Sequence, residues 1–267
     1  MTHTAESTLA KVRQVYGGAE GALWELLMGQ QIHLGGFRSS MELAERAGLV
    51  PGLRGVDLCC CNGAGMRFLV RFRGIAAMVG VDVTPEVIAL GETRCREEGL
   101  SDAISFKQAD VCASPLPSNE ADFVWGEDAW CYVWDKPALI AEAARLLKPG
   151  GTLAFTDWVS GPVPMTEEEL SRFLDFMRFP NVGSLARYVV WMEKAGFRVE
   201  EAADTGRFAP CVDLYLAMVD QQLTYDALKI LNFDPAAMAA IAAEMQFMQG
   251  LARDGKVIQG RFIARKP

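Results

Sequence analysis

The sequence of 267 residues predicts a doubly wound α/β fold, because short apolar runs alternate with helical patterns from residue 55 onward. Strands that are joined by helices are expected to pair in parallel, since a parallel neighbour needs a long crossover connection. Hydrophobic residues make up 51% of the chain and charged residues 22%, which is enough apolar side chain to fill one large core. We therefore expect a seven-stranded sheet with helices on both faces.

Seven apolar segments are predicted as strands, and the segments between them contain the signals that begin and end helices. Pro85 suits the first position of a helix, where its missing N–H costs nothing. Gly150 and Gly196 each follow a helical pattern and end it. The predicted strands are residues 55–60, 76–82, 104–110, 122–126, 152–156, 197–201 and 257–264. The predicted helices between them are residues 64–73, 85–98, 137–147 and 184–195.

Two segments, residues 1–50 and residues 208–254, do not follow this alternation and are helical by pattern. Ligands of open α/β sheets bind outside the carboxyl ends of the strands. We expect the two segments to cap that edge, the first as an N-terminal helical cap and the second as a lid. The core would then be residues 51–207, completed by a last strand in residues 255–267. The alternative is that the segments form an interface, as in a homodimer.

The charge balance excludes some classes of partner. The chain has 26 basic and 34 acidic residues, a net charge of −8, and no cluster of Lys or Arg, so nucleic acid and anionic membranes are poor partners. No apolar run has the length of a secretory signal or of a membrane-spanning helix. Seven cysteines, three of them consecutive, fit no disulfide framework. We expect a cytoplasmic protein with reduced thiols.

Acidic residues stand at the end of the first three predicted strands, as Asp57, Asp82 and Asp110. A carboxylate at the end of the second strand can accept both hydroxyls of a ribose, and one at the end of the third can accept an adenine amine. The loop after Asp57 leads into a helix whose N-terminal amides can hold a carboxylate. These residues predict an adenosine site, and Phe68, where a dinucleotide fingerprint has its third glycine, disfavours a nicotinamide cofactor. The alternative is that the aspartates cap turns.

With these motifs the chain resembles the class I S-adenosylmethionine-dependent methyltransferases, which have a Rossmann-like sheet. Residues 146–157, 195–197 and 260–266 resemble the family's later strands and last helix. Residues 30–35 and 128–132 are similar to the small-molecule branch of sarcosine/dimethylglycine and tocopherol/ubiquinone-type enzymes. The resemblance implies S-adenosyl-L-methionine as cofactor. Its implied contacts are Asp57, Cys59, Cys61, Gly63, Asp82, Val83, Asp110, Val111 and Glu127.

The cysteine triplet departs from this family, which usually has glycine at the positions of Cys59 and Cys61. Cysteine is small, so we expect the cofactor still to fit beside a loop of this composition. Consecutive strand residues point to opposite faces, which prevents three such thiols from converging on one ion. No metal site is expected.

Methyl transfer depends on alignment of the acceptor and exclusion of water, so few acid–base groups are needed. The loop after the fourth strand would face the methyl group, and we expect Asp128 and Trp130 to bind substrate and Tyr132 to be catalytic. The aromatic rings there, with Trp134, offer faces to a cationic amine. The alternative for the aromatic residues is core packing.

Three residues outside that loop complete the predicted site. Histidine suits a general base, and His33 stands in an element that resembles Ile-His-x-Gly, so we expect a catalytic role. Tyr16 is a second catalytic candidate, placed over the cofactor's carboxylate. Arg207 is expected to hold a carboxylate of the substrate, although an exposed ion pair would explain it equally well.

The predicted function is methylation of a small metabolite, at an amine nitrogen of an amino-acid-like acceptor such as glycine, sarcosine or dimethylglycine. A thiol or a thiophilic metalloid such as arsenite is the alternative acceptor, if Cys61, Cys131 and Cys211 meet in the fold. A non-catalytic module that binds S-adenosylmethionine is the third possibility.

Overall fold

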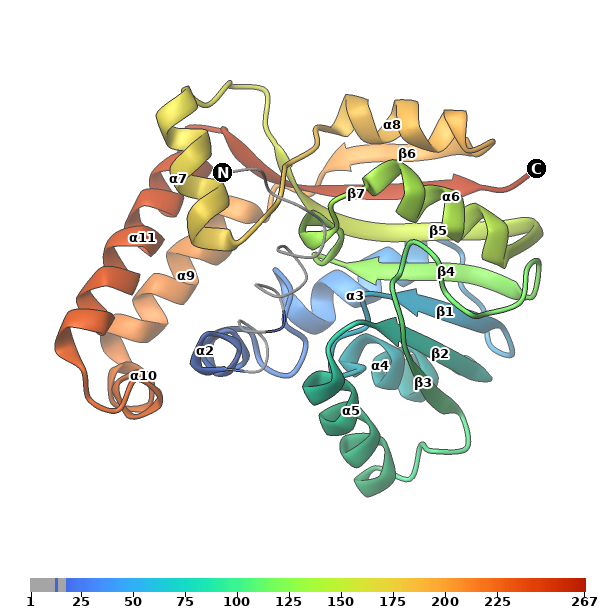
Figure 1. The fold of residues 1–267 in the computed structure, drawn as a ribbon, viewed down its shortest axis with the longest axis horizontal. Helices are drawn as coiled ribbons and strands as arrows, with labels where there is room; N and C mark the ends of the chain where they lie inside the picture. Colours follow the sequence, from blue (N-terminus) through green and yellow to red (C-terminus); the bar gives the residue numbers. More distant parts are fainter. Residues whose placement is uncertain (1–12, 14–17) are drawn as a thin grey trace.

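The computed structural model describes residue 13 and residues 18–267, in which seven strands form one sheet in the order β3-β2-β1-β4-β5-β7-β6 (Figure 1). The strands are β1 (Arg54–Leu58), β2 (Ala77–Asp82), β3 (Ile104–Gln108), β4 (Ala121–Glu127), β5 (Leu147–Ser160), β6 (Arg198–Asp204) and β7 (Val257–Arg265). The doubly wound α/β prediction is confirmed. All predicted strands except β5 are correct to within three residues at either end.

Two features of the sheet differ from the expectation. Strand β5 is longer than predicted because it continues through the buried residues Trp158 and Val159, which pair with β7. Strand β7 runs antiparallel to both β5 and β6, whereas β1 to β5 pair in parallel. The segment between β6 and β7 stays at the carboxyl edge of the sheet (Figure 1), so the chain re-enters the sheet from that edge and runs in the reverse direction.

Helices cover both faces of the sheet, and the four predicted helices are each correct to within one residue. The helices that flank the sheet are α3 (Gly36–Arg46), α4 (Ala64–Arg73), α5 (Pro85–Glu97), α6 (Lys136–Leu146) and α8 (Leu185–Lys194). One core cluster includes Ile140 of α6 and Val124 of β4, and the other includes Met66 of α4 and Phe123 of β4. Neighbouring residues of β4 thus enter different cores, as the two-residue period of a strand requires.

The remaining helices gather at the carboxyl edge, on the left of Figure 1. They are α2 (Ala19–Met28), α7 (Glu167–Met177), α9 (Phe208–Gln221), α10 (Thr224–Ile230) and α11 (Pro235–Arg253). A third apolar cluster, which includes Trp158, Phe173 and Met248, joins them to the sheet. Helix α7 was not predicted, although Thr166 and Glu169 form a capping box that signals its start. No helix within residues 18–267 is long and apolar enough to span a membrane.

A buried polar group, the carboxylate of Asp157 on β5, lies beneath the loop that follows β4. It accepts hydrogen bonds from the Tyr188 hydroxyl at 2.5 Å and from the backbone N–H of Cys131 at 2.8 Å. The buried Lys136 ammonium donates to the carbonyl of Val133 at 3.0 Å and to Asn181 Oδ1 at 2.7 Å. These bonds fix the loop. Burial raises the pKa of Asp157 to about 6, although the nearby Lys136 charge opposes the shift.

The raised pKa of Asp157 predicts that this residue makes the protein less stable as the pH rises. The folded state binds the proton more tightly than the unfolded chain, whose aspartates titrate near about 3.9, so stability is lost between about pH 4 and 6. The loss is at most about 3 kcal/mol. Urea denaturation of the wild type and of Asp157→Asn at pH 4.5 and 7.5 should show a smaller loss in the variant. Identical losses of stability in both proteins would contradict the raised pKa of Asp157 as the cause.

Candidate functional site

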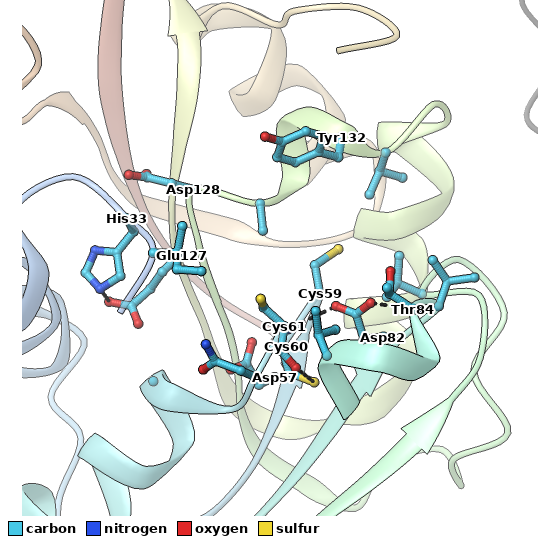
Figure 2. A pocket seen from close by; sticks show the side chains of 18 of the residues that line it. His33, Asp57, Cys59, Cys60, Cys61, Asp82, Thr84, Glu127, Asp128 and Tyr132 are labelled. Carbon is cyan, nitrogen blue, oxygen red and sulfur yellow. Dashed lines mark hydrogen bonds and ion pairs between the residues drawn. The ribbon is translucent and has the colours of Figure 1, made fainter. Parts of the chain in front are cut away.

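The main cavity, of about 340 Å³, lies at the carboxyl ends of β1 to β4, where the adenosine site is predicted (Figure 2). Parallel pairing brings these strand ends to one edge, so residues far apart in the sequence meet there. The predicted site residues that line the cavity are His33, Asp57, Cys59, Cys61, Asp82, Val83, Asp110, Val111, Glu127, Asp128 and Tyr132. Most of the predicted site is therefore brought together.

The cavity is strongly acidic. Its described lining contains six carboxylates and neither lysine nor arginine. The carboxylates are those of Asp57, Asp82, Asp110, Glu127, Asp128 and Asp135. Carboxylates held together in a partly buried space repel one another and attract cations more strongly than they would in water. The cavity is therefore suited to a positively charged ligand.

Asp57 has the least compensated charge of the six. Its side chain is buried, with 4% exposed, and no described residue donates a hydrogen bond to its carboxylate. Burial, followed by the negative charges of Glu127 and Asp82, raises the pKa of Asp57 well above its usual value. A cation bound beside Asp57 would favour the ionised carboxylate and so oppose this shift of its pKa.

Asp82 is held differently, because both of its oxygens accept backbone hydrogen bonds. The N–H of Thr84 donates to Oδ1 and that of Cys61 to Oδ2, each at 2.9 Å (Figure 2). Burial raises the pKa of Asp82, and these hydrogen bonds oppose the shift. Each oxygen keeps a further lone pair for a ligand. The bonds also tie the loop after β1 to the end of β2.

The loop after β1 has the backbone that glycine would adopt, although cysteine occupies it. Cys59 has φ 67° and Cys61 has φ 48°, both in the left-handed region. Each such residue costs roughly 1–2 kcal/mol, because its Cβ approaches the following carbonyl oxygen. Burial, followed by the charge of Asp82, raises the pKa of Cys61 to about 12, so this thiol stays protonated. Cysteine at positions 59 and 61 therefore adds backbone strain that glycine would not have, in a loop of the same left-handed conformation.

Glu127 is fixed from two sides at the end of β4. The Ser40 hydroxyl donates to Glu127 Oε1 at 2.7 Å, and His33 Nε2 lies 3.3 Å from the same oxygen (Figure 2). Ser40 Oγ also lies 3.1 Å from His33 Nε2. Because the hydroxyl gives its only hydrogen to Glu127, it accepts from Nε2, which places the imidazole hydrogen on Nε2. Nδ1 is buried and has no partner among the described residues.

Asp128 is held by groups from both ends of the chain. Its carboxylate accepts from the N–H of Leu34 at 2.8 Å and from Gln259 Nε2 at 2.8 and 3.0 Å. Sequence analysis did not identify Ser40 or Gln259. Neither belongs to a motif, since Ser40 is on α3 and Gln259 on β7, and only the fold brings them to the site.

Two predicted substrate residues do not line the cavity. Trp130 is fully buried, its indole N–H donates to the carbonyl of Leu58 at 3.1 Å, and its ring stacks on Phe155. Arg207 pairs with Glu42 and donates to Ser39 Oγ at 3.2 Å. Both side chains are thus engaged within the protein and lie outside the cavity lining, so the structure gives their predicted substrate contacts no support.

The other predicted residues are placed as follows. Gly63 precedes α4 with φ 72° and packs beside Phe106 outside the cavity lining, so its predicted cofactor contact is not seen. Trp134, expected to be either core or cavity wall, lines the cavity and is 43% exposed. Tyr16 lies outside the described residues.

Comparison with known proteins agrees with this geometry. Residues 56–155 match the family model of a methyltransferase domain. The chain is 27% identical over 201 residues to phosphoethanolamine N-methyltransferase 1 of Arabidopsis thaliana, covering 74% of this chain and 40% of that protein. It is 34% identical over 109 residues to dimethylglycine N-methyltransferase of Parasynechococcus marenigrum, covering 39% and 37%. The chain thus spans about two fifths of the length of these relatives.

A solved structure, of Haemonchus contortus phosphoethanolamine N-methyltransferase 2 in complex with S-adenosyl-L-methionine, has the same fold. The TM-score is 0.83 at 20% identity, over 98% of this chain and 60% of that one. The cavity and the matched domain define a methyltransferase fold. Over the matched domain the chain is similar to known methyltransferases, in agreement with the resemblance of its sequence to the S-adenosylmethionine-dependent methyltransferases.

The left-handed conformation of the loop after β1 makes a testable prediction. Cys61→Gly should raise the free energy of unfolding by about 1 kcal/mol, because glycine adopts a positive φ without steric conflict. The adjacent Cys60→Gly is the matched control. Cys60 is buried and is not in the left-handed region, so its loss should lower stability. Urea denaturation measures both, and equal destabilisation by the two variants would refute the strain argument.

Proposed function

We propose that the protein transfers the methyl group of S-adenosylmethionine to the amine nitrogen of a small molecule. The observation that supports this proposal is the cavity with six carboxylates and, in its described lining, no lysine or arginine. The cofactor's sulfonium and α-ammonium are cations, and so is a protonated amine. A phosphate or carboxylate on the acceptor would, like the carboxylate of the cofactor itself, have to be held away from these charges.

The residues of the cavity fit S-adenosylmethionine, which supplies the methyl group when bound. Asp82 would accept the ribose hydroxyls with its remaining lone pairs, and Asp110 would accept the adenine amine between Val83 and Val111. Asp57, which lacks a donor among the described residues, would pair with the ammonium. A Cβ on Gly65 would lie 2.7 Å from Glu127 Oε2, so a larger residue there would crowd the floor of the cavity.

A protonated amine must lose its proton before its lone pair can attack a methyl group, so the site needs a proton acceptor. His33 and Glu127 are the candidate pair, because both line the cavity and lie 3.3 Å apart. Ser40 holds the pair in one arrangement, and Nδ1 of His33 is buried without a partner among the described residues. General-base catalysis of this kind contributes about 10²–10⁴-fold to a rate.

Aromatic side chains complete the wall opposite the carboxylates. Tyr132 and Trp134 both line the cavity. The Tyr132 ring packs edge-on against the Phe179 ring, with 4.8 Å between the ring centroids. A cation over such a ring gains roughly 0.5–2 kcal/mol. The combination of aromatic rings and carboxylates favours an ammonium group and helps to exclude water from the acceptor side.

The described cavity gives no support to two more specific acceptors that the sequence suggested, an amino-acid-like amine and a thiophilic metalloid. An amino-acid-like acceptor needs a cation for its carboxylate, and Arg207, the predicted partner, is paired with Glu42. A thiophilic metalloid needs converging thiols, whereas the described residues contain no cluster of three His, Cys, Asp or Glu side chains placed to hold a metal ion. The proposal is therefore an amine without a required carboxylate. Turnover distinguishes it from a non-catalytic module.

The test is a screen of matched amines, alcohols and carboxylic acids of equal size with S-adenosylmethionine, read by mass spectrometry. We expect the gain of one methyl group only among the amines. In His33→Asn the turnover of a hit should fall about 10²-fold, because the proton acceptor is lost. The affinity for S-adenosylhomocysteine should stay within about twofold in that variant, since the adenosine contacts remain.

Methylation confined to alcohols or acids would contradict the amine proposal. Full turnover in His33→Asn would show that His33 only packs beside Glu127. Absence of methylation with every amine, despite cofactor binding, would favour the non-catalytic module.

A further inference from the structure

A second cavity, of about 80 Å³, lies among the helices at the carboxyl edge. It is lined by residues of α2, α7, α9, α10 and α11, and the described residues of its wall include Trp24, Leu27, Leu216, Ala242 and Met245. Tyr132 lines this cavity and also the acidic one, so the two cavities share this residue as part of their walls. The function proposed above makes no use of the second cavity.

The wall of the second cavity is apolar. Its described lining contains only two charged side chains, Glu20 and Arg178, which lie 3.8 Å from each other and are about half exposed. The Tyr215 hydroxyl in this wall accepts a hydrogen bond from the N–H of Gly35 at 3.4 Å. A polar group placed in this cavity would lose hydrogen bonds to water without replacing them, whereas a hydrocarbon would gain by burial.

The wall is also adaptable. Met177, Met238 and Met245 contribute flexible thioethers to it, and unbranched methionine fits ligands of varied shape. Met245 belongs to the apolar cluster that joins these helices to the sheet. A ligand here would therefore extend the core of the helical layer.

We propose that the acceptor is an amphiphilic amine, with its nitrogen in the acidic cavity and a hydrocarbon body in the apolar cavity beyond Tyr132. This inference rests on the proposed function, since it assigns the acceptor class of that site. The carboxylates select the charged end and the helices select the apolar end. A small polar amine such as glycine would leave the second cavity unused.

Calorimetric titration with butylamine, hexylamine and octylamine, with and without S-adenosylhomocysteine, tests the inference. Each added CH₂ should tighten binding about threefold to fourfold until the apolar cavity is filled. Methylation is not needed for this readout. Affinity that does not change with chain length would overturn the proposal.

Two adjacent alanines on α11 provide matched variants. Ala242 lines the apolar cavity, whereas Ala243 is exposed. Ala242→Trp should fill the cavity and abolish the chain-length dependence, with S-adenosylhomocysteine affinity unchanged, while Ala243→Trp should retain the dependence. Chain-length dependence that survives in both would place the hydrocarbon elsewhere and refute the assignment.

A third variant tests the same cavity in case Ala242→Trp does not fold. Met238→Ala enlarges the same cavity, so the tightest ligand should become a longer amine than in the wild type. An unchanged optimum would contradict the proposal. The outcomes also distinguish the two proposals. If affinity depends on chain length but no amine is methylated, only the proposed function is refuted. If amines are methylated but affinity does not depend on chain length, only this inference is refuted.

Discussion

The site depends on one physical constraint, the concentration of uncompensated carboxylates at the carboxyl ends of parallel strands. Asp57, Asp82 and Glu127 come from three strands that pair side by side, and no lysine or arginine among the described lining residues neutralises them. Burying such charges is unfavourable unless a partner is supplied. The protein shows this cost in the raised pKa of Asp57. A cationic ligand beside these carboxylates would reduce that cost.

Distant parts of the chain hold these carboxylates in place. Ser40 and His33, before the first strand, fix Glu127, and Gln259 of the last strand fixes Asp128. Asp157 and Lys136 fix the loop that follows β4 from below. Backbone strain is part of the same region, since three of the seven described non-glycine residues with positive φ, Cys59, Cys61 and Asp128, line the cavity. Backbone strain of this kind persists where the surrounding structure determines the conformation.

The strand-end acids were predictable from the sequence, because the order of strands and helices dictates parallel pairing and parallel strands end at one edge. The position of Trp130 could not be predicted from the sequence. It follows β4 in a short 3-10 helix, η1 (Trp130–Tyr132), which buries the indole in the core and leaves Tyr132 at the cavity. The sequence left a substrate contact and an ion pair open for Arg207, and its ion-pair partner Glu42 could not be identified because it lies 165 residues away. The antiparallel direction of β7 and the apolar cavity both depend on how helices α9 to α11 pack, which periodicity does not specify.

The measurement that tests the central claim most directly is a calorimetric titration with S-adenosylhomocysteine and with an analogue that lacks only its α-amino group. If the carboxylates bind a cation, the analogue should bind at least about tenfold more weakly, a difference of about 1.4 kcal/mol. Equal affinities of the two compounds would contradict the claim that the acidic lining of this cavity selects a cation.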